Sequence, residues 1–174
     1  THSLLRVTTV DDPRPWLCDV GFGAGPLAPL ELSPDVGEVR AGDWRFRLER
    51  TRGELDTGVW FLHHFANGGW VSRIRFTENP SYRIDFAVSN HFVSTSPRSP
   101  FVSRPFIQRM HPDAHHTLDA TTWTTDYPDG SARTHHVTPA DLPKLLTETF
   151  DIDLTPQDAD ALVVAPWANA HADA

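Results

Sequence analysis

The chain has 174 residues, enough for one ordinary domain or two small ones, each with a core of its own. Hydrophobic residues make up 39% and charged residues 22%, which excludes wholesale disorder, and the net charge of -8 argues against a general DNA or RNA binder. A single cysteine excludes an internal disulfide framework and a cysteine-rich zinc module.

Short runs rich in β-branched and aromatic residues fill the first half of the chain. The first two, residues 4–9 and 15–20, flank an Asp-Asp-Pro turn and predict a β-hairpin. Three further strands are expected at residues 44–49, 58–65 and 70–76, and Asn67-Gly68-Gly69 predicts a tight turn between the last two. Strands at this spacing without helices between them indicate an antiparallel barrel or sandwich, and we expect a barrel domain over residues 1–82.

The pattern changes after residue 80, where apolar residues return at helical spacing. Residues 83–94 are predicted to form an interdomain helix. Residues 95–174 follow as a small α/β lid, with a strand expected over residues 101–110 and two helices near the end. Each of these helices begins with a Thr-Pro pair, at residues 138–139 and 155–156, where threonine is the expected N-cap. The predicted fold class is therefore α+β: an antiparallel barrel, a connecting helix and a lid.

The first hairpin places a histidine beside an aspartate. An antiparallel pair that turns at residues 11 and 12 brings His2 opposite, or diagonal to, Asp19, and alternation puts both side chains on one face. An imidazole held by a carboxylate supplies two of the three members of a nucleophile–base–orienter triad. The commoner interpretation is a surface histidine at a strand end that happens to lie near an acid.

Cys18 is the obvious candidate nucleophile, but its position argues against that role. It neighbours Asp19 in the strand, so its side chain points to the opposite face, with Trp16 and Val20. We interpret Cys18 as a small apolar residue of the core. A triad built on His2 and Asp19 therefore lacks its nucleophile in this chain.

The stretches T-H-S-L-L-R-V and P-W-L-C-D-V-G-F-G closely resemble the two later catalytic motifs of arylamine N-acetyltransferases. A third stretch, D-F-A-V-S-N-H-F-V-S-T-S-P-R-S-P-F at residues 85–101, resembles a later motif of the same family. The family's histidine and aspartate complete a Cys-His-Asp triad, and they match His2 and Asp19. Its cysteine lies in an R-G-G-x-C-x-E motif on an N-terminal helical domain, and that motif does not occur here. The resemblance therefore implies the C-terminal portion of such an enzyme, without the N-terminal helical domain.

This resemblance also implies a reaction and its site residues. Acetyl-CoA would acetylate the cysteine, and the acetyl group would then pass to a small aromatic amine or hydrazine in a ping-pong mechanism. His2 would deprotonate the thiol and Asp19 would orient His2, so the 174 residues alone are expected to be inactive. The implied substrate-binding residues are Phe22 and Phe101, for which plain packing is the alternative. The implied coenzyme A contacts are Thr95, Ser96 and Ser99, for which a capped, solvated loop is the alternative.

Two other functions stay open at this point. Amide synthases that close ansamycin-type macrolactams resemble the acetyltransferases and use the same triad, although the loop S-T-S-P-R-S-P favours the acetyltransferase. A non-catalytic remnant or binding module would also fit a chain without a nucleophile.

Histidines at positions 111, 115 and 116, together with the pairs at 63–64 and 135–136, raise the possibility of a metal site, but they follow no metal-binding helix motif. We therefore expect surface histidines and no metal. No apolar run approaches the roughly 20 residues that span a bilayer, and the N-terminal residues lack a signal-peptide pattern. The expected location is the cytoplasm, and the expected partners are coenzyme A, the acceptor and the missing N-terminal domain. Neither a nucleic acid nor a membrane is an expected partner.

Overall fold

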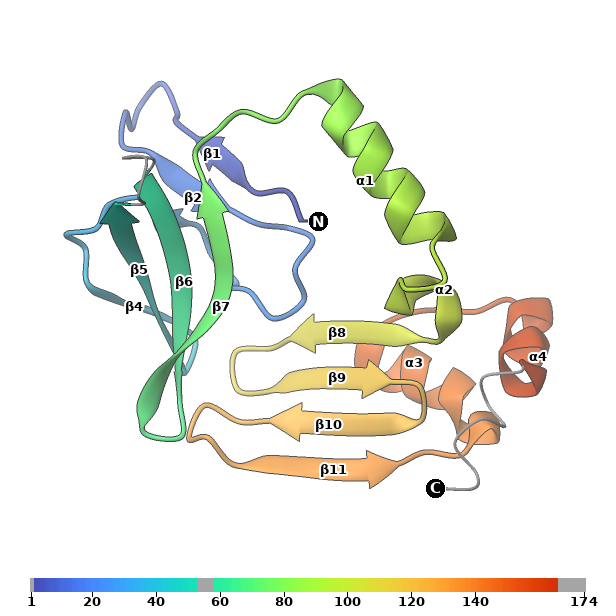
Figure 1. The fold of residues 1–174 in the computed structure, drawn as a ribbon. Coiled ribbons are helices and arrows are strands. Elements are labelled where there is room, and N and C mark those ends of the chain that lie inside the picture. Colours follow the sequence, from blue (N-terminus) through green and yellow to red (C-terminus); the bar gives the residue numbers. More distant parts are fainter. Residues whose placement is uncertain (1, 53–57, 166–174) are drawn as a thin grey trace. The chain divides into compact units, whose positions relative to one another are not determined.

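The computed structural model describes residues 2–52 and 58–165 (Figure 1). The chain divides into two compact units. The first unit is formed by Thr1–Tyr82, Met110–Ala114 and Tyr127–Ser131, and the second unit by Arg83–Arg109, His115–Asp126 and Ala132–Ala174. The chain passes from the first unit to the second after Tyr82. Two short segments within residues 95–174 nevertheless belong to the first unit.

The first unit contains two antiparallel sheets (Figure 1). The smaller sheet has the order β1-β2-β3, formed by Leu5–Val7, Trp16–Cys18 and Leu30–Glu31. The larger sheet has the order β4-β5-β6-β7, formed by Glu38–Ala41, Trp44–Arg52, Gly58–Ala66 and Gly69–Thr77. Among the described residues the two sheets share no strand pair, so the predicted barrel does not close. Strands of two or three residues in the smaller sheet are too short to wrap around a closed barrel.

The tight turn predicted between β6 and β7 is present. Ala66 pairs with Gly69, and Asn67 and Gly68 between them have φ values of 52° and 77°. Two successive positive φ angles are the geometry of a type I′ turn, which matches the right-handed twist of the strands and suits Asn-Gly. The local sequence alone therefore specified this hairpin.

The core of the first unit lies between the inward faces of the two sheets. Alternate residues of β5 and β6 are buried, among them Phe46 at 1% exposure and Trp60 at 2%. Leu17 of β2 and Leu30 of β3 belong to the same apolar cluster. Period-two burial of this kind is the pattern that the alternating sequence of these strands predicts.

The second unit combines helices with one antiparallel sheet of order β11-β10-β9-β8. These strands are Ala132–His136, Thr122–Asp126, His115–Asp119 and Phe106–Met110. The helices are α1 (Arg83–Thr95), α2 (Pro100–Ser103), α3 (Leu142–Phe150) and α4 (Pro156–Val164), with a 3₁₀ turn, Pro139–Asp141, before α3. Leu118 of β9 and Leu142 and Leu146 of α3 form the buried core of this unit. The mixture of helices with antiparallel sheets confirms the α+β class.

Two elements of the second unit begin several residues later than the sequence predicts, and prolines explain both delays. The strand expected over residues 101–110 begins only at Phe106, because Pro100 starts the short helix α2 and Pro105 follows its last turn. The helix expected from residue 139 becomes α-helical only at Leu142. Pro143 lacks the N–H that would bond to the Pro139 carbonyl, so the first turn is 3₁₀ instead.

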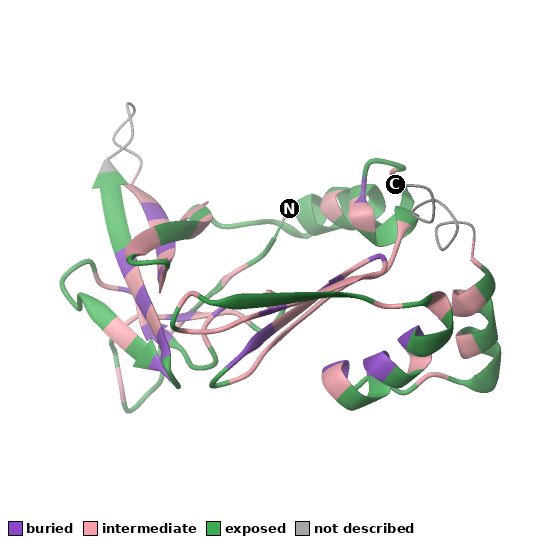
Figure 2. Ribbon diagram, turned by 90° about the horizontal axis from the view of Figure 1, so that it is seen from below, coloured by how far each residue is buried: buried purple, intermediate pink, exposed green. Residues whose placement is uncertain are grey.

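Helix α1 has no buried residue, and most of its residues are exposed (Figure 2). Ile84, Val88 and Phe92, spaced four residues apart, are 66%, 63% and 48% exposed. The periodicity therefore predicted the helix correctly, and the apolar residues that carry it are exposed. Within the described ranges, no helix is both long and apolar enough to cross a membrane.

Candidate active site

The candidate site lies at the open end of the β1–β2 hairpin. Leu5 pairs with Cys18 and Val7 with Trp16, so β1 and β2 run antiparallel with a fixed register. Three residues before β1, His2 approaches Asp19, the residue directly after β2. His2 Nε2 lies 2.7 Å from Asp19 Oδ2, which is the contact expected from the sequence.

Asp19 is held from two sides. Its Oδ1 accepts hydrogen bonds from the backbone N–H groups of Gly21, at 3.0 Å, and Phe22, at 3.1 Å, while its Oδ2 faces His2. The Asp19 side chain is only 3% exposed, whereas that of His2 is 33% exposed. An ionised carboxylate only accepts hydrogen bonds, so the contact with Asp19 is a hydrogen bond when His2 carries a proton on Nε2. The second ring nitrogen, Nδ1, is then the one that can take up a proton from another group.

The loop after Asp19 packs against the imidazole. The ring centroids of His2 and Phe22 are 5.6 Å apart, and the two rings are tilted by 51°. The Cβ atom of any side chain at Gly21 would lie 3.5 Å from His2 Cε1. The Gly25 N–H donates to the Phe22 carbonyl at 3.0 Å and closes a turn that keeps Phe22 next to His2. Phe22 is half-buried here, and its ring forms one wall of the site.

The predicted core position of Cys18 is wrong. Leu17 points into the core at 5% exposure, while Cys18 is half-buried and Val20 is 96% exposed. The sequence pattern was ambiguous because Trp16, Leu17, Cys18 and Val20 are all apolar, and only the sheet packing decides which face is inward. Asp19 directly follows β2, and because successive residues of an extended chain point to opposite faces, we still expect the side chains of Cys18 and Asp19 to diverge.

The hydroxyl groups expected near coenzyme A lie in the second unit, where α1 ends and α2 begins. Thr95 Oγ1 donates to the His91 carbonyl at 2.6 Å. Ser99 is 2% exposed, and its Oγ donates to the Val93 carbonyl at 2.7 Å. These two hydroxyls therefore satisfy backbone carbonyls at the end of α1.

Ser96 and Phe101 lie in the same region, where Ser96 is half-buried and Phe101 is exposed. Ser96 Oγ accepts a hydrogen bond from the Arg98 N–H at 3.3 Å. Phe101 is 60% exposed, and its ring meets that of Phe106 edge to face, with centroids 5.7 Å apart. Packing in the core, the alternative interpretation of Phe101, does not match this exposure.

A groove in the second unit was not foreseen from the sequence. It has a volume of about 480 Å³, and its apolar lining comes mainly from α2, β8, α3 and α4. Its walls include Phe101, Ile107, Leu146 and Leu162. Because these residues are distant in sequence, no local pattern could reveal the groove.

The expectation of surface histidines is wrong for two of them. His115 is 2% exposed, with Nδ1 3.4 Å from a carboxylate oxygen of Asp126, and His64 is 5% exposed beside Arg73. In the part of the chain that the structure describes, no three histidine, cysteine, aspartate or glutamate side chains gather as a metal site would require.

Comparison with known proteins gives consistent results. Residues 1–159 match the model of a protein family described as N-acetyltransferase. An arylamine N-acetyltransferase from Mycolicibacterium smegmatis is 33% identical over 120 residues, which cover 68% of this chain and 41% of that protein. The crystal structure of the Nocardia farcinica arylamine N-acetyltransferase is 60% identical with a TM-score of 0.88, over 97% of this chain and 59% of that one.

A further structure is the Mycobacterium marinum arylamine N-acetyltransferase in complex with CoA. It is 26% identical with a TM-score of 0.77, over 94% of this chain and 60% of that one. The chain thus spans between 41% and 60% of the length of these three relatives.

Proposed function

Because the chain belongs to the N-acetyltransferase family, we propose that its His2–Asp19 pair serves acyl transfer from acetyl-CoA to an arylamine or arylhydrazine. The observation that carries this proposal is the 2.7 Å contact between His2 Nε2 and a carboxylate that is itself held by two backbone N–H groups. A carboxylate in this position fixes the tautomer and orientation of a general base. The coenzyme A donor is supported by the relative whose structure contains CoA.

In the proposed mechanism, His2 Nδ1 takes the proton of a cysteine thiol, and Asp19 stabilises the imidazolium that results. The thiolate attacks the thioester carbonyl of acetyl-CoA, the bond to the CoA sulfur breaks, and the departing sulfur takes the proton back from His2. The amine nitrogen then attacks the acetyl-cysteine while His2 accepts an amine proton. Returning this proton to the cysteine sulfur releases the N-acetyl product and regenerates the thiol, so the two half-reactions form a ping-pong cycle.

The nucleophile in this mechanism is a cysteine other than Cys18. The Cys18 side chain projects from the strand face opposite to that of Asp19, so it cannot meet His2 Nδ1 without rearrangement of β2. The 174 residues alone are therefore expected to transfer no acetyl group.

We retain Phe22 of the first unit and Phe101 of the second unit as candidate substrate-binding residues, each on its own observation. Phe22 is favoured because its ring lies 5.6 Å from the imidazole, and Phe101 because its ring is accessible. For coenzyme A we retain Thr95, Ser96 and Ser99. The buried Ser99 hydroxyl acts by shaping the loop, whereas Thr95 and Ser96 can contact the ligand directly.

The proposal is tested by release of free CoA thiol from acetyl-CoA in the presence of an arylamine, measured on the intact gene product that carries this chain. Asp19→Asn should lower kcat by roughly 10³-fold or more, since loss of the orienting carboxylate leaves the base in the wrong tautomer. Double-reciprocal plots at several acceptor concentrations should be parallel. Cys18→Ala is the matched control and should keep its activity.

Four outcomes would contradict this proposal. Loss of activity in Cys18→Ala would make Cys18 the nucleophile, and intersecting lines would exclude the ping-pong order. Absence of transfer from acetyl-CoA, together with ring closure of a carrier-bound polyketide, would assign the amide synthase reaction instead. If neither donor supports acyl transfer, the result would favour a non-catalytic binding module instead of an enzyme.

A further inference from the structure

We propose that Asp12, Arg14 and Glu31 form a clamp that positions His2 against Asp19 by fixing the register of the β1–β2 hairpin from its far end. The three residues are called the hairpin clamp below. This inference rests on the proposed function of the His2–Asp19 pair, and it assigns positioning residues that do not touch the reacting atoms.

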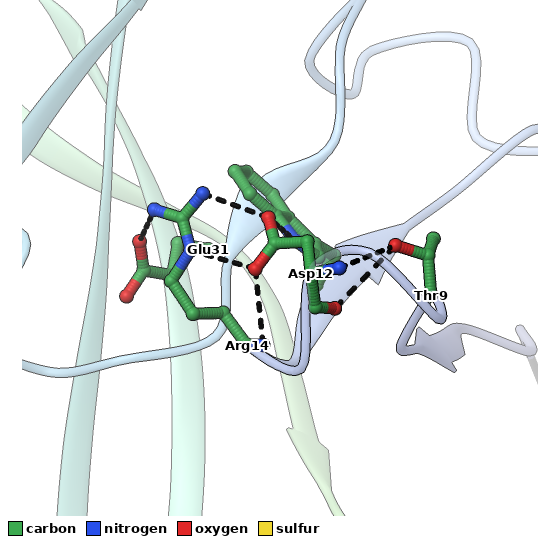
Figure 3. A network of polar contacts seen from close by, with 5 residues as sticks. Thr9, Asp12, Arg14 and Glu31 are labelled. Atoms are coloured by element: carbon green, nitrogen blue, oxygen red, sulfur yellow. Dashed lines mark hydrogen bonds and ion pairs between the residues drawn. The ribbon is translucent and has the colours of Figure 1, made fainter.

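One guanidinium links the three side chains of the hairpin clamp (Figure 3). Arg14 donates from Nε to Asp12 Oδ1 at 2.9 Å and from Nη2 to Asp12 Oδ2 at 2.7 Å. Its Nη1 donates to Glu31 Oε2 at 3.0 Å. The first two bonds are the parallel, bidentate type that gives geometric specificity as well as attraction. The third bond ties the hairpin turn to β3.

The turn is closed by further contacts to Asp12. The Thr9 N–H donates to the Asp12 carbonyl at 3.1 Å, and the Asp12 N–H donates to Thr9 Oγ1 at 3.1 Å. Trp16 Nε1 donates to Asp12 Oδ2 at 3.1 Å, and Arg14 Cζ lies 4.9 Å from the centre of the Trp16 ring. The Asp12 carboxylate is thereby connected to the first residue of β2.

Register matters here because the ladder is short. Among the residues that the structure describes, three residue pairs join β1 to β2, and two pairs join β2 to β3. A slip of one residue would move His2 by roughly 3.3 Å along the strand and turn its side chain to the other face of the hairpin. Either change would break the contact with Asp19. Trp16 pairs with Glu31 in the second ladder, so the hairpin clamp links β2 to β3 and is joined through Thr9 to the chain just after β1.

If the hairpin clamp only stabilised the fold, breaking it would lower the free energy of unfolding without a specific effect at His2 and Asp19. The Arg14, Asp12 and Glu31 side chains are 56%, 28% and 24% exposed, and exposed ion pairs contribute little to the free energy of unfolding. Breaking the hairpin clamp should therefore leave overall stability almost unchanged while it disturbs the distant site.

The test compares Arg14→Gln with the wild-type 174-residue chain by NMR. Proximity of the His2 and Phe22 rings is read from nuclear Overhauser effects, and amide hydrogen exchange is followed at Gly21 and Phe22, whose N–H groups donate to Asp19. We expect the ring contact to be lost and exchange at these two amides to accelerate about tenfold or more, with an unchanged urea midpoint. Arg45→Gln is the matched control, because Arg45 makes a similar two-bond pair with Glu38 at 2.8 and 2.7 Å in the other sheet of the same unit. This control should leave both readouts unchanged.

Unchanged ring contact and exchange in Arg14→Gln would overturn the proposal. If that variant instead unfolds, Glu31→Gln decides, because it removes only the 3.0 Å link to β3 and keeps the Asp12–Arg14 pair. Faster exchange at Gly21 and Phe22 would support the hairpin clamp, and unchanged exchange would contradict it. These readouts do not depend on catalysis, so a failure of the proposed function would appear separately, as full acetyl transfer by Asp19→Asn.

Discussion

Asp19 organises the candidate site with a single carboxylate. One oxygen is fixed by the backbone N–H groups of Gly21 and Phe22, and the other is directed at His2 Nε2. At 3% exposure, the side chain exchanges few hydrogen bonds with water, which strengthens those that it makes to the protein. The imidazole is therefore oriented by a group that is itself rigidly held.

The ionisation of a second single residue, Asp12, predicts how the contacts of its carboxylate depend on pH. Hydrogen bonds from the Arg14 side chain hold the pKa of the Asp12 carboxyl at about 2, below the ordinary value of 3.8. A carboxyl whose pKa is lower in the folded state contributes stability above the unfolded pKa and loses it as pH falls through the folded pKa. For this solvent-accessible ion pair, screening by water keeps that contribution small. The contacts of Asp12 should therefore persist below pH 3.8 and open near pH 2.

This opening can be followed by NMR at the Trp16 indole N–H, which donates to Asp12. Its signal should titrate with a midpoint of about 2 in the wild type and at a higher pH in Arg14→Gln, because the variant loses the side-chain hydrogen bonds that lower the pKa most. Arg45→Gln should leave the midpoint at its wild-type value. Equal midpoints in the wild type and Arg14→Gln would show that Arg14 does not hold the carboxyl in its ionised form.

At the scale of elements, the two Thr-Pro pairs that look alike in sequence behave differently. Thr155 caps α4, since its Oγ1 accepts from the Asp158 N–H at 3.2 Å and donates to the Asp158 carboxylate at 2.7 Å. Thr138 precedes a 3₁₀ turn, and its side chain accepts no backbone N–H of that turn. Pro143, four residues after Pro139, is the difference between the two sites.

Thr155→Ala should lower the free energy of unfolding by about 1 kcal/mol, because a backbone N–H at the start of α4 loses its partner. Thr138→Ala is the matched control, and it should cost less than about 0.5 kcal/mol. Urea unfolding followed by circular dichroism measures both variants. Equal costs would mean that the hydroxyl of Thr155 does not act as a cap.

At the scale of the whole molecule, each unit has a core of its own. Trp60, Phe46 and Leu62 centre the core of the first unit, while Leu118 and Leu142 centre that of the second. The two clusters share no residue among those described. Stability should accordingly respond locally to changes in either core.

Trp60→Ala should lower the free energy of unfolding by about 3–5 kcal/mol and accelerate amide exchange in β5, β6 and β7. Leu118→Ala should cost about 2–5 kcal/mol and act on β9, β10 and α3 instead. Hydrogen exchange measured by mass spectrometry resolves the two regions. If either substitution accelerates exchange equally in both units, the cores are not independent.

The sequence by itself determined the features that depend on neighbouring residues. Turn residues at positions 11–13 and 67–69 placed two hairpins, and the first of them put His2 beside Asp19, because antiparallel register follows from the position of the turn. Apolar periodicity located α1, and a Thr-Pro pair located the start of α4. Both signals lie within a few neighbouring residues.

Tertiary structure decided what depends on distant partners. Whether Leu17 or Cys18 faces the core is set by packing against the larger sheet, since both residues are apolar and alternation alone allows either face. The same holds for the separation into two sheets, for the burial of His64 and His115 and for the link from Arg14 to Glu31. Each of these features depends on segments that no short window of sequence contains together. Burial and ion pairing arise where strands meet in space, so only the folded chain reveals them.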